Sequence, residues 1–212
     1  MTRKNIIGIV LNSLMIIFEI IAAAHFIYNN GFYDFRFYTL CSNALGGVVS
    51  LLWLIQILFK VENKKFKDIV KYFSYTAAIC LTVTFIIVLI VLVPMAAGKI
   101  GFWSSFKHYV LESPNLFQHL ICPILFVVTF MYNYEFTYSK NHKDNLIACI
   151  ATLVYAVIVL ILCIARAVEP PYPFYDVYNQ PWYMSVFWAI VVLGITYLIS
   201  MLVKFVKAKV TK

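Results

Sequence analysis

The stretch A-A-I-C-L-T-V-T-F-I-I-V-L-I-V-L-V, residues 77–93, contains no charged side chain. It belongs to an apolar block over residues 69–97, and a helix of that length is long enough to cross a hydrocarbon core of about 30 Å. Similar blocks recur along the chain. Because each block is continuous, helices are favoured over the short alternating strands of a β-barrel. We expect helices near residues 5–28, 35–59, 69–97, 114–133, 146–166 and 182–206.

The composition of the whole chain agrees with these blocks. The 212 residues are 63% hydrophobic and 12% charged, and the mean hydropathy is +0.87, far above the range of soluble domains. We therefore predict an all-α polytopic protein of the cell membrane, a single domain over residues 1–212 built as a bundle of six transmembrane helices. Arg3 and Lys4 ahead of the first block are also typical of a signal peptide, but Glu19 within the block favours a retained helix.

The positive charges are distributed unevenly about these blocks. Of the 17 Lys and Arg residues, thirteen lie on the side of the two termini, in residues 3–4, 60–71, 140–143 and 204–212. Four lie on the other side: Arg36, Lys99, Lys107 and Arg166. The positive-inside rule then places both termini in the cytoplasm. This distribution explains the basic excess better than nucleic-acid binding does, and the five cysteines, which form no C-x-x-C pair, indicate no disulfide framework.

Polar side chains within the predicted spans gather in their outer halves. They are Glu19, His25, Arg36, Thr39, Ser42, Asn43, Gln118, His119 and Arg166, whereas Gln56 is the main strongly polar residue of the inner halves. Polar groups that face lipid are costly. We therefore expect a cavity that opens outward.

Two of these residues lie at matching depths. With Ser113 as the N-cap of its helix, His119 lies about 7.5 Å below the helix start. With Asp34 as a cap, Thr39 lies at about the same depth in a parallel helix. Pro123 lacks an N–H, which leaves the carbonyl of His119 without its helical partner and predicts a bend there.

The paired residue types indicate an activated nucleophile. A threonine hydroxyl needs a base within hydrogen-bond reach, and the imidazole of His119 supplies one to Thr39. Candidates for oxyanion or substrate binding are Ser42, Asn43 and Arg166, and candidates for orienting the imidazole are Glu19, Asp34, Glu169 and Asp176. Structural roles stay open: a membrane threonine often bonds its own backbone, an asparagine often joins helices, and Glu19 can pair with an arginine.

Two other classes of protein stay open as alternatives. The first is a small transporter or channel that uses Glu19, His119 and Arg166 in an outward polar cavity. The second is a haem or quinone protein with His25 and His119 as ligands. Because the chain has no H-E-x-x-H motif and no close histidine pair, we expect no metal site and no cofactor.

Three motifs carry a resemblance to a known family. F-R-F-Y-T-L-C-S-N at 35–43, N-x-x-x-H-x-x-x-P at 115–123 and P-Y-P-F-Y-D-V at 171–177 together resemble the androgen-induced gene 1 family, most closely its bacterial six-helix relatives. The resemblance implies a multi-pass hydrolase of fatty acid esters of hydroxy fatty acids, with Thr39 as nucleophile and His119 as its histidine. The chain departs from the animal members at Leu116, where they have a second histidine, at Pro123, and at Ser42 and Asn43.

From the residues and the resemblance together we predict a lipid-ester hydrolase whose partner is a membrane lipid. An acyltransferase that uses the same site stays open, as does the oligomeric state. The proline-rich loop at 170–173 is either an outer lid or a rigid connector.

Overall fold

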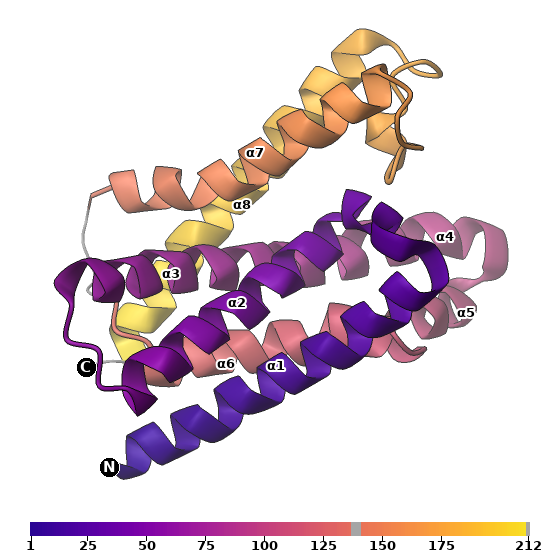
Figure 1. The fold of residues 1–212 in the computed structure, drawn as a ribbon. Coiled ribbons are helices and arrows are strands. Elements are labelled where there is room, and N and C mark those ends of the chain that lie inside the picture. The colour runs from indigo at the N-terminus through magenta and orange to yellow at the C-terminus, as the bar shows by residue number, and fades with distance from the viewer. Residues whose placement is uncertain (137–140, 211–212) are drawn as a thin grey trace.

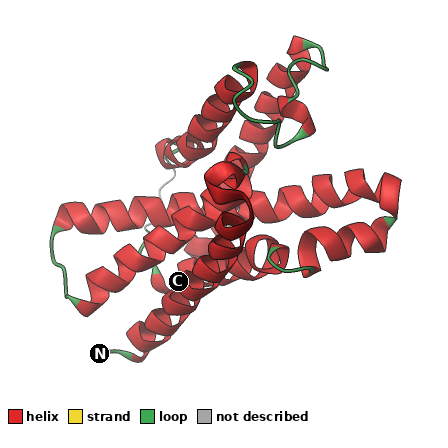
Figure 2. Cartoon of the chain, turned by 45° about the vertical axis from the view of Figure 1, so that its right-hand side comes forward, coloured by secondary structure: helices red, strands yellow, loops and turns green. Residues whose placement is uncertain are grey.

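A computed structural model describes residues 1–136 and 141–210 of the chain. Lys140 and Lys212, which were counted above among the basic residues, lie outside this part. Within it, the chain forms helices and loops and no strand (Figure 2), which confirms the predicted all-α class.

Four long helices lie side by side as a bundle (Figure 1): α1 (Arg3–Asn30), α2 (Tyr38–Leu58), α3 (Lys64–Ile87) and α6 (Cys122–Asn133). A 3₁₀ helix, Gly31–Arg36, joins α1 to α2. Side-chain caps begin two of the helices, because the oxygen of Thr2 accepts from the N–H of Asn5 and that of Asn63 accepts from the N–H of Phe66.

The connection between α3 and α6 is itself helical. A π-helix, Val88–Leu92, extends α3 into α4 (Val93–Ile100). The chain then turns at Gly101, whose φ of 82° favours glycine. It returns through α5 (Phe102–Phe106) and a second π-helix, Lys107–Leu111, before a third, Phe117–Ile121, leads into α6. We predicted a loop after residue 97, and the structure corrects that expectation.

Two of the three π-helices in the described chain end two residues before a proline. Val93 follows the first and precedes Pro94, and Cys122 follows the last and precedes Pro123. A proline ring crowds the carbonyl four residues back and donates no hydrogen bond. A wider turn before the ring relieves both problems: the N–H of Cys122 donates to the carbonyl of Phe117, five residues earlier. The irregularity expected at Pro123 is therefore present as a π turn.

The remaining two long helices form a separate pair, α7 (Lys143–Ile164) and α8 (Trp182–Val210). In Figure 1 this pair contacts α3 and rises away from α1, α2 and α6 toward its far end. The loop between α7 and α8, with a short 3₁₀ turn at Pro173–Tyr175, reaches back to the start of α2. Tyr172 and Tyr175 pack there against Phe37 and Tyr38.

The centre of the bundle is a closely packed apolar layer. Met15, Val49, Leu81 and Phe126 are fully buried in it. At Gly46 an added Cβ would lie 2.8 Å from Met15 and 2.9 Å from Leu81, so the absent side chain lets α2 approach α1 and α3. Small residues permit this kind of contact between membrane helices.

Within the part of the chain that the structure describes, five helices are long and apolar enough to cross a membrane: Arg3–Arg36, Tyr38–Leu58, Lys64–Ile100, Lys143–Ile164 and Trp182–Val210. These five helices identify a helical integral membrane protein. The sixth predicted span corresponds to Phe117–Asn133, which is apolar but shorter than the other five. Many large apolar side chains of the long helices are exposed, among them Ile17, Ile158 and Leu198, as a lipid-facing surface requires.

Candidate functional site

The structure brings Thr39 and His119 together. Thr39 is the second residue of α2, and His119 is the middle residue of the π turn before α6. The Oγ1 of Thr39 lies 3.2 Å from the Nε2 of His119. Both side chains are buried.

The other nitrogen of His119 decides the direction of that hydrogen bond. Its Nδ1 lies 2.6 Å from the backbone carbonyl oxygen of Tyr109, and a carbonyl can only accept. The Nδ1 therefore carries the proton, so in the neutral ring the Nε2 is an acceptor. The Thr39 hydroxyl then donates to His119, which is the arrangement of a nucleophile and its base.

A residue from a distant loop caps the helix that carries Thr39. The expected cap, Asp34, instead accepts a hydrogen bond from Asn30, and the N-cap position of α2 has no side-chain cap of its own. The Tyr172 hydroxyl oxygen lies 3.2 Å from the backbone N of Tyr38 and accepts from it. Sequence reasoning missed Tyr172 as a site residue, because nothing local links it to α2.

The Tyr172 hydroxyl also contacts Thr39. Burial raises the pKa of Tyr172 to about 12, although hydrogen bonds with Tyr38 and Thr39 oppose the rise. The hydroxyl is therefore protonated near neutral pH. It provides a hydrogen-bond donor next to the Thr39 side chain.

Thr39 lies between two cavities. The outer one has a volume of about 330 Å³ and is lined by Thr39, His119, Tyr109, Asn115 and Tyr172, together with apolar side chains and the prolines at 171 and 173. This cavity gives both members of the pair access to a ligand.

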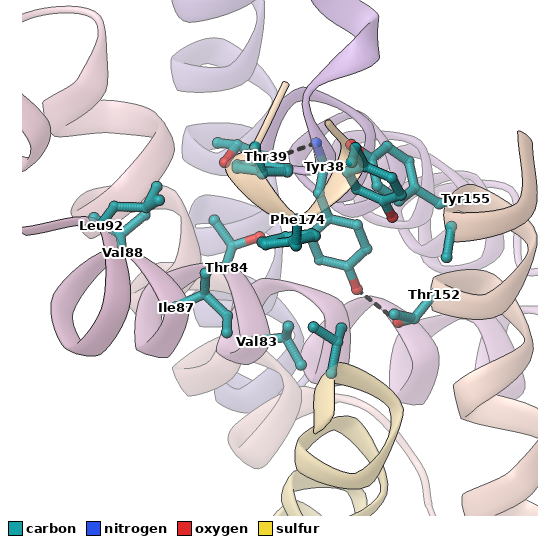
Figure 3. Close-up of a pocket in the computed structure, with 14 residues that line it drawn as sticks. Tyr38, Thr39, Val83, Thr84, Ile87, Val88, Leu92, Thr152, Tyr155 and Phe174 are labelled. Atoms are coloured by element: carbon teal, nitrogen blue, oxygen red, sulfur yellow. Dashed lines mark hydrogen bonds between the residues drawn. The ribbon is translucent and has the colours of Figure 1, made fainter. Parts of the chain in front are cut away.

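The second cavity is a narrow apolar slot of about 40 Å³ on the other side of Thr39 (Figure 3). Val83, Ile87 and Tyr155 line it. It adjoins a third cavity of about 100 Å³ between α7 and α8, with which it shares Ala156 and Phe174. The three spaces follow one another past Thr39 toward the lipid-facing side of α7 and α8.

Polar neighbours hold the pair in place from behind. Asn43 donates from its Nδ2 to the carbonyls of Thr39 and Gln118, at 2.9 Å each, and so ties α2 to the π turn of His119. The Gln118 amide donates to Glu19 at 3.0 Å. Ser42 lies 3.0 Å from the Thr39 carbonyl. None of Ser42, Asn43 and Glu19 lines the cavities beside Thr39. Their contacts are structural, and their oxyanion and orienting roles stay predictions.

Two further expected site residues lie elsewhere. Arg166 stacks over the ring of Tyr178, 4.4 Å from its centroid, and Asp176 accepts from Asn179 at 3.0 Å. Both line a different cavity in the α7–α8 loop. The group that orients His119 is the Tyr109 carbonyl rather than a carboxylate.

The contacts of His119, the exposure of His25 and the central apolar layer are the features that bear on the two alternative classes. For a haem or quinone ligand, both nitrogens of His119 are already engaged, one by Thr39 and one by Tyr109. His25 is exposed, and the described residues contain no cluster that could hold a metal ion. For a channel, the apolar layer of Met15, Val49, Leu81 and Phe126 separates the site from the opposite end.

The inner half is nevertheless more polar than the sequence predicted. Five strongly polar residues are buried there: Asn12, Asn133, Asn145, Lys204 and Lys207. They lie near predicted helix ends and pair with local groups, as when the Tyr134 hydroxyl donates to Asn12 at 2.7 Å. These residues correct the expectation that Gln56 stands nearly alone there.

No protein family, curated protein or solved structure matches the chain. The fold and the site therefore define it only as a helical integral membrane protein with a buried threonine–histidine pair beside a cavity.

Proposed function

We propose that the protein is a membrane-embedded lipid-ester hydrolase with Thr39 as nucleophile and His119 as general base. The observation that carries the proposal is the hydrogen-bonded series from Thr39 through His119 to the Tyr109 carbonyl. The resemblance of the three motifs to the androgen-induced gene 1 family supports it. With both termini in the cytoplasm, as proposed from the basic residues, the site faces the outer leaflet.

The reaction proceeds in two steps in this proposal. Thr39 Oγ1 attacks the acyl carbonyl while His119 Nε2 takes the hydroxyl proton, and His119 then gives that proton to the leaving alcohol. Water attacks the acyl-threonine ester in the second step, with His119 taking its proton. The bond from the acyl carbon to Thr39 Oγ1 then breaks, His119 returns the proton to Thr39, and the fatty acid leaves. If an alcohol replaces water, the same site transfers the acyl group.

The start of α2 supplies the electrostatic stabilisation. The first N–H groups of a helix have no partner within the helix and lie at the positive end of its dipole. Thr39 is the second residue of α2, so an oxyanion formed on its substrate develops beside those N–H groups. The Tyr172 O–H adds a side-chain donor. Donors placed in this way contribute a large share of the rate enhancement in acyl transfer.

In this proposal, the two parts of an ester substrate occupy different cavities. With its carbonyl at Thr39, the acyl chain lies in the apolar slot that leads toward α7 and α8, and the alcohol part lies in the outer cavity beside Asn115. A substrate with two apolar arms, such as a fatty acid ester of a hydroxy fatty acid, fits this division.

The test is labelling of the purified protein in detergent with a tagged fluorophosphonate, followed by hydrolysis of lipid esters in liposomes. Thr39→Ala should abolish labelling, and His119→Ala should slow it by about a hundredfold or more, the usual contribution of a general base. Both should reduce ester hydrolysis in parallel.

Thr129→Ala is the matched control. Its hydroxyl is buried in α6 and donates to the Leu125 carbonyl at 2.7 Å, away from the cavities, so labelling should persist. Equal labelling of wild type and Thr39→Ala would show that Thr39 is not the nucleophile. If folded wild type neither labels nor hydrolyses any ester, the hydrolase proposal fails and transport regains weight.

A further inference from the structure

A second polar cavity lies at the end of the bundle that holds both termini, away from Thr39. It has a volume of about 390 Å³ and is enclosed by the ends of α1, α2, α3 and α6. Four lysines line it, namely Lys4, Lys64, Lys67 and Lys71, against two carboxylates, Asp68 and Glu135. The cavity therefore has a positive charge excess.

One of the four lysines is neutralised from outside the cavity, because Lys67 pairs with Glu62. Lys4, Lys64 and Lys71 then remain against Asp68 and Glu135, an excess of one positive charge. Within the described residues, Lys4, Lys64 and Lys71 have no carboxylate within ion-pair distance. Like charges gathered around a cavity repel one another unless an anion lies among them.

The floor of the cavity is buried and offers an unsatisfied acceptor. Trp53 and Asn133 are 5% and 6% exposed. The Nδ2 of Asn133 donates to the Lys4 carbonyl at 3.1 Å, and its Oδ1 has no hydrogen-bond partner among the described residues. A buried acceptor without a donor is costly. A ligand that brings a hydroxyl or ammonium group removes that cost.

We propose that this cavity binds a phosphate ester that also carries a hydroxyl or ammonium group. The phosphate lies among Lys4, Lys64 and Lys71, for which a compact ammonium is a suitable partner, and the donor group of the ligand binds Asn133 Oδ1. Two sources share this chemistry: the headgroup of a membrane phospholipid, as in basic pockets between membrane helices, and a small soluble phosphate ester. The proposal is independent of the reaction at Thr39.

The buried Trp53 ring provides the readout. Purified full-length protein in a neutral detergent is titrated with dioctanoyl phosphatidylglycerol, with glycerol 3-phosphate, and with uncharged dioctanoylglycerol, while tryptophan fluorescence is recorded. We expect a saturable change with at least one phosphate ester, none with dioctanoylglycerol, and loss of the change in Trp53→Phe. Saturation by the lipid alone identifies the headgroup as the source, and saturation by glycerol 3-phosphate identifies a soluble ester.

Variants that remove a positive or a negative charge should change the affinity in opposite directions, whereas misfolding would lower it in both. Lys71→Gln should weaken binding about fivefold or more, and Glu135→Gln should tighten it, because each removes one charge near the ligand. Asn133→Asp tests the acceptor: the added negative charge should weaken phosphate binding. Lys65→Gln is the control, since Lys65 neighbours Lys64 in α3 but does not line the cavity, and it should leave the affinity unchanged.

Two results overturn the proposal. One is the absence of a saturable change with either phosphate ester. The other is an affinity that changes equally in Lys71→Gln and Lys65→Gln, or that falls in Glu135→Gln.

Discussion

At the scale of single residues, the backbone carbonyl of Tyr109 prepares His119 for its proposed role. A neutral histidine can present either ring nitrogen as the acceptor. The contact between Nδ1 and the Tyr109 carbonyl leaves Nε2 unprotonated toward Thr39. The carbonyl belongs to the π-helix Lys107–Leu111, so a short connecting segment determines which nitrogen of the His119 ring accepts from Thr39.

Tyr172→Phe tests the hydroxyl that meets both Tyr38 and Thr39. We expect hydrolysis to fall about a hundredfold, as for the loss of one oxyanion donor, while fluorophosphonate still reacts at Thr39. Ester hydrolysis by wild type and Tyr172→Phe, compared at equal labelling, checks this. If hydrolysis is unchanged in Tyr172→Phe, the hydroxyl only caps α2 and is not an oxyanion donor.

Tyr172 also predicts a difference in stability at high pH. The pKa of Tyr172 is raised to about 12 by burial, above the value of about 10 for an exposed tyrosine. Its stabilising contribution is therefore fully present below pH 10 and is lost as the pH rises toward 12. Thermal unfolding between pH 8 and pH 11 should show a smaller loss of stability for Tyr172→Phe than for wild type.

The sequence could predict which two residues meet but not what surrounds them. Thr39 and His119 could be matched because each lies shortly after the start of a parallel helix. Tyr109 and Tyr172 could not be found in this way, since both come from connections whose paths depend on tertiary contacts. Ser42, Asn43 and Glu19 were assigned to the site because they are polar and lie in the outer halves of the predicted spans. Their hydrogen bonds to backbone carbonyls and to Gln118 show a supporting position instead.

At the scale of elements, a proline in an apolar run predicts that the helix is irregular there. The sequence does not predict which form the irregularity takes. The sequence predicted a bend at Pro123, and the structure forms a π turn before both Pro94 and Pro123. The helical connection over residues 93–111 was not predicted, because Gly98, Lys99 and Gly101 are typical of a loop. Packing against the bundle, where Val93 and Val110 are buried together, stabilises the helical form.

Gly8→Ala tests the close approach of α1 to its neighbours. An added Cβ at Gly8 would lie 2.2 Å from Asn133 Nδ2 and 2.4 Å from the Trp53 ring. Relieving those overlaps should cost about 1–3 kcal/mol and lower the midpoint of thermal unfolding by about 2–10 °C.

Gly194→Ala in α8 is the matched control, because an added Cβ there meets no atom within 4 Å. It should be neutral or slightly stabilising, since alanine favours a helix. Equal midpoints for the two variants in a thermal scan would contradict the packing described at Gly8.

At the scale of the whole molecule, the divergence of α7 and α8 from the bundle creates the apolar slot beside Thr39. Ala156→Phe adds a ring where the slot meets the cavity between α7 and α8. Hydrolysis of long-chain esters should fall at least tenfold, while a short acetyl ester should still react, because only a long chain extends that far. A series of esters of increasing acyl length measures the effect.

Val154→Phe, on the exposed face of α7, introduces the same ring outside the slot. This variant should hydrolyse the series of esters with the same dependence on acyl length as wild type. A uniform loss of activity over all chain lengths in Ala156→Phe would indicate a folding defect rather than a blocked acyl path.

The contact between Tyr172 and the first N–H group of α2 has a consequence for how a substrate reaches Thr39. Tyr172 lines the outer cavity and also caps the helix that carries Thr39. A movement that lifts its loop away from the cavity would therefore also free the end of α2. A substrate path that opens to water by lifting this loop would thus loosen the geometry of the Thr39–His119 pair. Arrival within the plane of the membrane, between α7 and α8, leaves the cap in place, so turnover should depend on the two-dimensional concentration of the lipid rather than on its solubility.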